Sequence, residues 1–87
     1  MKYRIEYLES VIASDIPRLS KVAQRQVKRA IETKLTSTPI EFGKPLRYSL
    51  KGARSLRVGD YRVIFTIEGD DGILVVKIGH RREVYKQ

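Results

Sequence analysis

The chain has 87 residues, of which 41% are hydrophobic, so it has room for one domain with one modest core, and we treat residues 1–87 as that domain. It contains no cysteine, which excludes disulfides and thiolate metal sites. The sequence has neither a signal peptide nor an apolar run near the roughly 20 residues of a membrane span, so we expect a soluble, cytoplasmic protein. Eighteen Lys and Arg against ten Asp and Glu give a net charge of +8, which is typical of a protein with an anionic partner. Nucleic acid, an acidic protein and an anionic membrane surface are the usual partners, and we favour nucleic acid, RNA in particular.

The N-terminal half predicts one strand followed by helices. Polar and apolar residues alternate from Lys2 to Leu8, as in a half-buried strand. A first helical turn is expected over Val11 to Ser14, and Pro17 suits the start of the main helix, with Ser14 or Asp15 as its cap. The segment 36–39 ends this helix. Its apolar stripe recurs at helical spacing and consists of Leu19, Val22, Ala23, Val27, Ala30, Ile31 and Leu35.

The C-terminal half predicts an antiparallel meander of strands. A loop is expected over 40–51, and strands are expected over 55–58, 61–68 and 73–79, separated by Gly59-Asp60 and by the four residues 69–72. The tail 81–85 is expected to add a short extended segment. The order β-α-α-β-β-β gives an α+β class, with two helices packed on one face of an antiparallel sheet.

The turn spacing sorts the side chains of the sheet into two faces. A two-residue loop at Gly59-Asp60 places Arg57 opposite Arg62, and a four-residue loop at 69–72 places Glu68 opposite Ile73. The face toward the helices then carries the apolar residues Leu56, Val58, Tyr61, Val63, Phe65, Ile67, Leu74, Val76 and Ile78. The other face carries Arg57, Arg62, Ile64, Thr66 and Lys77, with Arg81 in the same register.

The arginines on the second face indicate an anion site. Like charges directly opposite each other destabilise a sheet, and a bound anion would offset the cost of placing Arg57 across from Arg62. Between Lys44 and Arg62 the chain has six cations and a single acid, Asp60. The alternative is that these residues form the solvated side of a half-exposed sheet. We favour the anion site because solvated faces usually mix the two signs.

Three segments resemble a known family. Leu56–Phe65 (LRVGDYRVIF) is similar to the central hairpin of the RelE/ParE toxin superfamily from bacterial and archaeal toxin–antitoxin systems, and 42–46 (FGKPL) and 78–85 (IGHRREVY) agree with it. The resemblance implies a RelE-like fold of the microbial-RNase type and a toxin restrained by a cognate antitoxin. RelE-like members cleave mRNA in the ribosomal A site, whereas ParE-like members poison DNA gyrase.

The resemblance also implies roles for individual residues. Arg62 and Arg81 match the arginines that RelE-like members place around the scissile phosphate, and Tyr85 matches a tyrosine that stacks on a base or orients the RNA. Arg57 falls where the family has a basic strand residue. The other cations expected to bind RNA are Lys51, Arg54, Lys77 and Arg82. The family's strand lysines are replaced by Ala53 and Ser55, so the general base and acid stay unassigned.

Metal-free RNA cleavage uses the ribose 2′-OH as nucleophile and needs a base, an acid and cations around the phosphorane. Arginine suits the last role because its planar fork matches two phosphate oxygens. His80, the only histidine, is able to give or accept a proton near neutrality. Strict alternation turns it toward the helix side, however, where a purely structural role is the alternative. One histidine and no cysteine do not favour zinc, and we expect neither metal nor cofactor.

Three functions are therefore open. The leading one is a ribosome-dependent endoribonuclease acting on mRNA in the A site. The second is a gyrase-inhibiting toxin, which needs no acid or base. The third is an inactive member that only binds RNA or its antitoxin.

Overall fold

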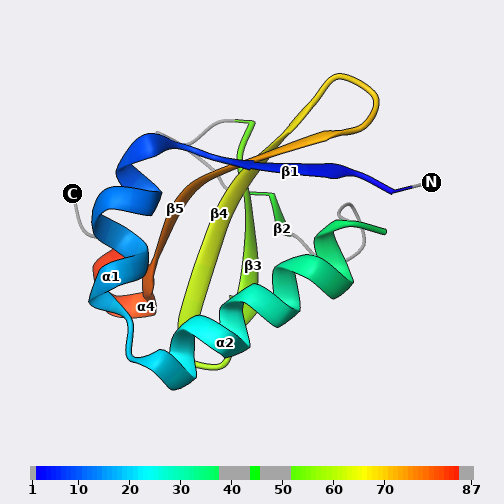
Figure 1. The fold of residues 1–87 in the computed structure, drawn as a ribbon. Coiled ribbons are helices and arrows are strands. Elements are labelled where there is room, and N and C mark those ends of the chain that lie inside the picture. The colour runs from blue at the N-terminus through cyan, green and yellow to red at the C-terminus, as the bar shows by residue number, and fades with distance from the viewer. Residues whose placement is uncertain (1, 38–43, 46–51, 85–87) are drawn as a thin grey trace.

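The computed structural model describes residues 2–37, 44–45 and 52–84. The elements are β1 (Arg4–Tyr7), η1 (Val11–Asp15), α1 (Ile16–Arg18), α2 (Lys21–Ala30), η2 (Ile31–Leu35), β2 (Lys44–Pro45), β3 (Arg54–Val58), β4 (Tyr61–Glu68), β5 (Gly72–His80) and α4 (Arg81–Val84). The strands form one sheet in the order β1-β5-β4-β3-β2, and two helical arms, η1–α1 and α2–η2, lie against one of its faces (Figure 1). The predicted α+β class is confirmed. The sheet is mixed where an antiparallel one was predicted, because β1 runs parallel to β5 whereas the other neighbours are antiparallel.

The main helix begins later than its sequence predicts. The first arm continues through Pro17 to Arg18, and α2 starts at Lys21 with Ser20 as its N-cap. The Ser20 hydroxyl accepts a hydrogen bond from the Ala23 N–H at 3.1 Å, which satisfies one of the free donors at the helix start. The prediction of Ser14 or Asp15 as the cap was wrong, because the chain breaks at Leu19. The predicted end of this arm at 36–39 is confirmed, since η2 ends at Leu35.

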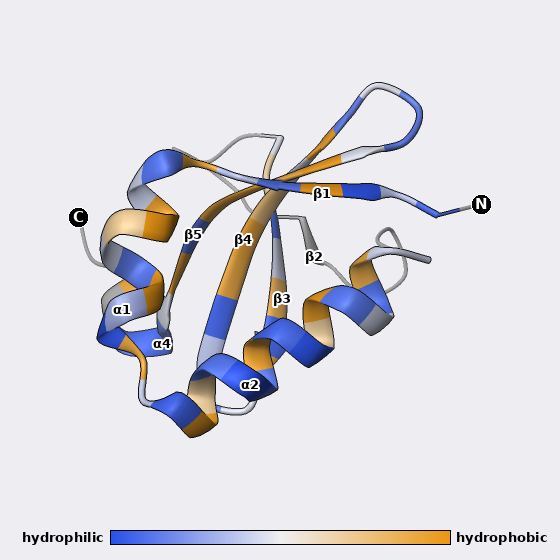
Figure 2. Cartoon of the chain, in the orientation of Figure 1, coloured by the Kyte–Doolittle hydropathy of each residue, from blue (hydrophilic) through white to orange (hydrophobic). Residues whose placement is uncertain are grey.

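The predicted apolar stripe faces the sheet, with one exception. Figure 2 shows the hydrophobic side of α2 turned toward the strands and the hydrophilic side turned away. Val22 was expected in the stripe but is 56% exposed, so it lies outside the core. None of the helices in the described ranges has the length and apolar composition needed to cross a membrane. The main core consists of Val11, Leu19, Ala23, Val27, Ile31, Leu35, Leu56, Val63, Phe65, Ile73, Val75 and Ile78.

A β-bulge in β5 changes which of its side chains face the helices, compared with the prediction from the sequence. The β3–β4 register is as expected, with Arg57 opposite Arg62. In β5, however, Ile64 pairs with Lys77 whereas Phe65 pairs with Val75, so Val76 is left without a partner and Glu68 faces Gly72 instead of Ile73. Before the bulge, Ile73 and Val75 face the helices, where Leu74 and Val76 had been predicted.

The second face of the sheet is partly covered, contrary to expectation. The tail was predicted to be extended, but Arg81–Val84 forms the helix α4. Val84 is buried with Ala53 and Ile64 in a small cluster against which Val76 packs. Gly79 permits this approach, since a Cβ at that position would lie 3.1 Å from Val84 Cγ2. The predicted loop 40–51 also contains the two-residue strand β2, which pairs with β3.

The free edge of β5 is closed by a side chain from η1. β1 pairs with β5 only from Gly72 to Val75, and the chain then turns into the first helical arm. Further along β5, Asp15 Oδ2 accepts a hydrogen bond from the Ile78 N–H at 2.9 Å. This bond joins residues 63 positions apart and fixes the helical arm against the last strand.

We predict that Asp15→Ala lowers the free energy of unfolding by about 1.5–3 kcal/mol, because the Ile78 N–H loses a charged acceptor. Urea denaturation followed by circular dichroism measures the change. Asp15→Asn keeps an acceptor oxygen and should lose clearly less stability. Asp70→Ala in the exposed β4–β5 turn is the control, and an equal loss there would contradict the assignment.

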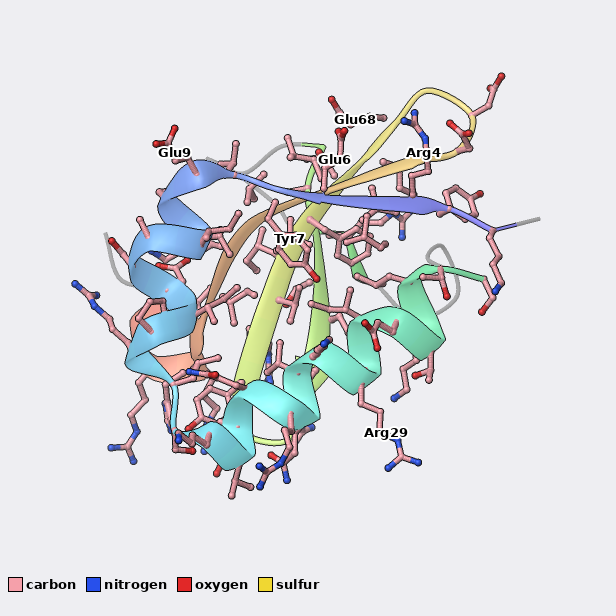
Figure 3. The ribbon with its side chains drawn as sticks, viewed as in Figure 1. Arg4, Glu6, Tyr7, Glu9, Arg29 and Glu68 are labelled. Carbon is pink, nitrogen blue, oxygen red and sulfur yellow. The ribbon has the colours of Figure 1, made fainter. Side chains whose placement is uncertain are left out.

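Tyr7 lies between the sheet and α2, and Figure 3 shows its side chain pointing from β1 into that space. It is half-buried beside the main core. Burial raises the pKa of the Tyr7 phenol above its ordinary value of 10.0, and the negative charge of Glu32 raises it further. The folded state therefore favours the neutral phenol.

Because the folded pKa lies above the unfolded one, the stabilisation from neutral Tyr7 is complete below about pH 10 and is lost as the pH rises through the folded pKa. We predict that Tyr7→Phe loses less stability than the wild type between pH 9 and pH 11, as measured by urea denaturation at each pH. Identical pH profiles would contradict this.

Candidate functional site

Arg57, Arg62 and Lys77 form a group on the second face of the sheet, which we call the cation face. Arg57 is exposed and lies directly opposite the half-buried Arg62. Gly79 lies opposite Arg62 on the other side, and Lys77 occupies the diagonal position two residues earlier. Diagonal neighbours are about 7–8 Å apart, within reach of long side chains. The Arg62 Nη1 donates to the Tyr61 carbonyl at 3.2 Å. The prediction that these three cations share a face is therefore confirmed.

Arg81 and Arg82 lie at the same end of the sheet but belong to α4. The Arg81 N–H donates to the Asp60 carbonyl at 2.9 Å, which ties the start of α4 to the β3–β4 turn. Both side chains are exposed. The structure therefore places Arg81 beside the strands that carry Arg57 and Arg62, but on a helix and not in the strand register that was expected.

His80 is on the helix side, as strict alternation predicts. It lies opposite Tyr61, and the two rings meet edge to face with centroids 5.8 Å apart and an angle of 76°. The His80 Nδ1 accepts a hydrogen bond from the Arg82 N–H at 3.2 Å, so the neutral ring carries its proton on Nε2. His80 is thus separated from Arg62 by the thickness of the sheet.

The remaining predicted RNA-binding residues are not gathered on the cation face. Arg54 lies opposite Phe65 in the ladder, which places it on the side of the main core. Lys51 and Tyr85 lie outside the described residues. Ala53 and Ser55, at the positions of the family's lysines, are both buried. This part of the second face is therefore apolar, and the cations concentrate at the end near the β3–β4 turn.

A pocket at the edge of β5 was not predicted from the sequence. We call it the edge pocket; it has a volume of about 510 Å³ and is lined by Asp15, Arg18, Leu19, Tyr61, Lys77, Ile78, Gly79, His80 and Val84. Arg18 and Tyr61 were missed because nothing local marks them.

Comparison with known proteins agrees with the resemblance. Residues 5–85 match the family model described as the ParE toxin of the type II toxin–antitoxin system parDE. Toxin RelE of Mycobacterium tuberculosis is 31% identical over 80 residues, covering 91% of this chain and 82% of that toxin. Toxin RelG of the same organism is 33% identical over 54 residues, and the match spans only 62% of its length.

Solved structures share the fold. The RelBE2 toxin–antitoxin complex from M. tuberculosis superposes with a TM-score of 0.85 at 25% identity, over 95% of each chain. The isolated RelE toxin of E. coli gives 0.72 at 20% identity, over 95% of this chain and 90% of that one. This chain thus shares with these toxins a mixed sheet with two helical arms on one face. The chain belongs to the RelE/ParE superfamily of type II toxin–antitoxin toxins.

We predict that Arg57→Gln raises the free energy of unfolding by about 0.2–1 kcal/mol, because it removes the repulsion across the ladder from Arg62. Urea denaturation in low salt measures the gain. Added salt screens the same repulsion and should shrink the difference between the two proteins. A less stable Arg57→Gln at every salt concentration would show that the pair carries no strain.

Proposed function

We propose that this toxin is a ribosome-dependent endoribonuclease that cleaves mRNA in the A site by attack of the ribose 2′-OH on the neighbouring phosphate. The observation that carries the proposal is the opposition of Arg57 and Arg62, with Lys77 on the same face and Arg81 at the adjoining turn. Such an arrangement costs stability when empty, and a bound phosphate offsets that cost. The similarity to proteins named RelE from M. tuberculosis and E. coli supports the same proposal.

In this proposal the arginines stabilise the transition state. A phosphorane carries more negative charge than the phosphodiester from which it forms, so fixed cations lower its energy more than that of the substrate. Arg62 and Arg81 are assigned to the phosphate oxygens, with Arg57 and Lys77 along the RNA backbone. His80 faces away from Arg62, which favours a positioning role through its bond to the Arg82 N–H.

The general base and the general acid are the parts of the proposed reaction for which the described residues offer the fewest candidates. Ala53 and Ser55, which stand at the positions of the family's lysines, are both buried. Lys51 is kept as a reserve candidate for the base, and the resemblance gives Tyr85 a role in stacking on a base or orienting the RNA. A site with strong cations and weak proton-transfer groups depends on correct orientation of the 2′-OH, which the ribosomal A site is proposed to provide.

The proposed partner is a cognate antitoxin. The neighbouring solved structures include toxin–antitoxin complexes from M. tuberculosis and Methanococcus jannaschii. With a net charge of +8, this chain is suited to an acidic segment that shields the cation face.

Gyrase inhibition is the second candidate function. The family model that matches the chain carries the name of the ParE toxin, and the buried Ala53 and Ser55 supply no proton-transfer group. Inhibition by binding alone needs none. It predicts loss of supercoiling activity and no cleavage of mRNA.

Primer extension on programmed ribosomes tests the proposal. Wild type should cut at the A-site codon, and Arg62→Ala and Arg81→Ala should each slow the cut by about 100-fold or more, as expected for lost transition-state charge stabilisation. Arg29→Ala, an exposed residue of α2 that points away from the sheet (Figure 3), is the matched control and should cleave normally. Intact mRNA under conditions in which the protein still arrests growth would favour gyrase, and no growth arrest would favour an inactive member.

A further inference from the structure

The edge pocket gathers polar side chains from the first helical arm and from two strands of the C-terminal half. Asp15 comes from η1 and Arg18 from α1. Tyr61 comes from β4, and Lys77 and His80 come from β5. Its volume of about 510 Å³ falls within the range of sites that hold small ligands, roughly 300–1,000 Å³. The pocket opens at the edge of the sheet, whereas Arg57 and Arg62 lie on its second face. Lys77 belongs to both regions.

The charge of the pocket favours an anion. Arg18 and Lys77 are exposed, and neither takes part in an ion pair with a residue that the structure describes. The one carboxylate in the lining is Asp15, and its Oδ2 already accepts the hydrogen bond from the Ile78 N–H. The lining therefore holds two basic side chains against one carboxylate that is already hydrogen-bonded.

His80 adds one hydrogen-bond donor, its Nε2–H. Because its Nδ1 accepts from the Arg82 N–H, the ring offers only its Nε2–H to a ligand. Its edge-to-face contact with Tyr61 limits the rotation of the ring. A ligand that accepts several hydrogen bonds and carries negative charge satisfies this set of donors, whereas a cation or an apolar ligand does not.

We propose that the edge pocket is a second anion site that binds a phosphate group through Arg18, Lys77 and His80 and that shares only Lys77 with the cation face. The phosphate belongs either to an RNA strand that passes over the β5 edge or to a free mononucleotide. The proposal does not depend on the cleavage reaction, since binding is measured without ribosomes.

Amide chemical-shift titration of the full chain tests the site with three probes: inorganic phosphate, uridine monophosphate and a short single-stranded RNA. We expect saturable shifts centred on Ile78, Gly79 and His80. Arg18→Ala should weaken binding by about tenfold, the factor that corresponds to one charge-assisted hydrogen bond. Arg25→Ala removes the same charge from the exposed side of α2 and should leave binding unchanged.

Two further results complete the test. His80→Asn supplies an oxygen that still accepts from the Arg82 N–H but lacks Nε2–H, so it should weaken binding while the fold is retained. If the RNA causes the same amide shifts as inorganic phosphate and uridine monophosphate, the site is assigned to RNA phosphates. If only inorganic phosphate and uridine monophosphate cause them, the site is assigned to a free nucleotide. Shifts spread over the cations of α2, or equal losses in Arg18→Ala and Arg25→Ala, would overturn the proposal.

Discussion

The faces of this sheet depend on one unpaired residue, Val76. Strict alternation from Ile73 and Val75, which face the helices, would send Lys77 into the core as well. The bulge at Val76 shifts the alternation by one, so Lys77 reaches the opposite face while Ile78 returns to the core. The main core and the cation face are thus compatible only because β5 has one residue more than its partner.

The second face combines two kinds of surface that have opposite requirements. One end is a small apolar cluster closed by Val84 from α4, and the other end carries opposed arginines. The apolar end needs cover from water, whereas the cationic end needs an anionic partner or solvent. Gly79 lies between them, opposite Arg62 in the ladder, and its missing side chain leaves room for Val84.

The features that could be predicted from the sequence are those fixed by residues close together in the chain. The β3–β4 hairpin and its opposed arginines were predictable, because the two-residue turn at Gly59-Asp60 fixes the register. The bulge was not, since Ile73 to Val76 are four consecutive apolar residues that fit either face. The helix cap was misplaced because the chain breaks at Leu19 and Ser20 caps α2. The Asp15 side chain bonds instead to Ile78, a contact that only the fold creates. The edge pocket was invisible for the same reason, since its residues meet only after β5 has packed on the first helical arm.

The parallel pairing of β1 with β5 has a consequence for the order of assembly. The two strands are distant in the sequence, and the Asp15–Ile78 bond that fixes the first helical arm against β5 joins residues 63 positions apart. Contacts of such long range form slowly, because the chain between them must first be brought together. β4 carries Arg62 and lies between β3 and β5 in the sheet. During synthesis the β3–β4 hairpin is therefore available before β5, and the cation face is complete only after β5 has joined the sheet.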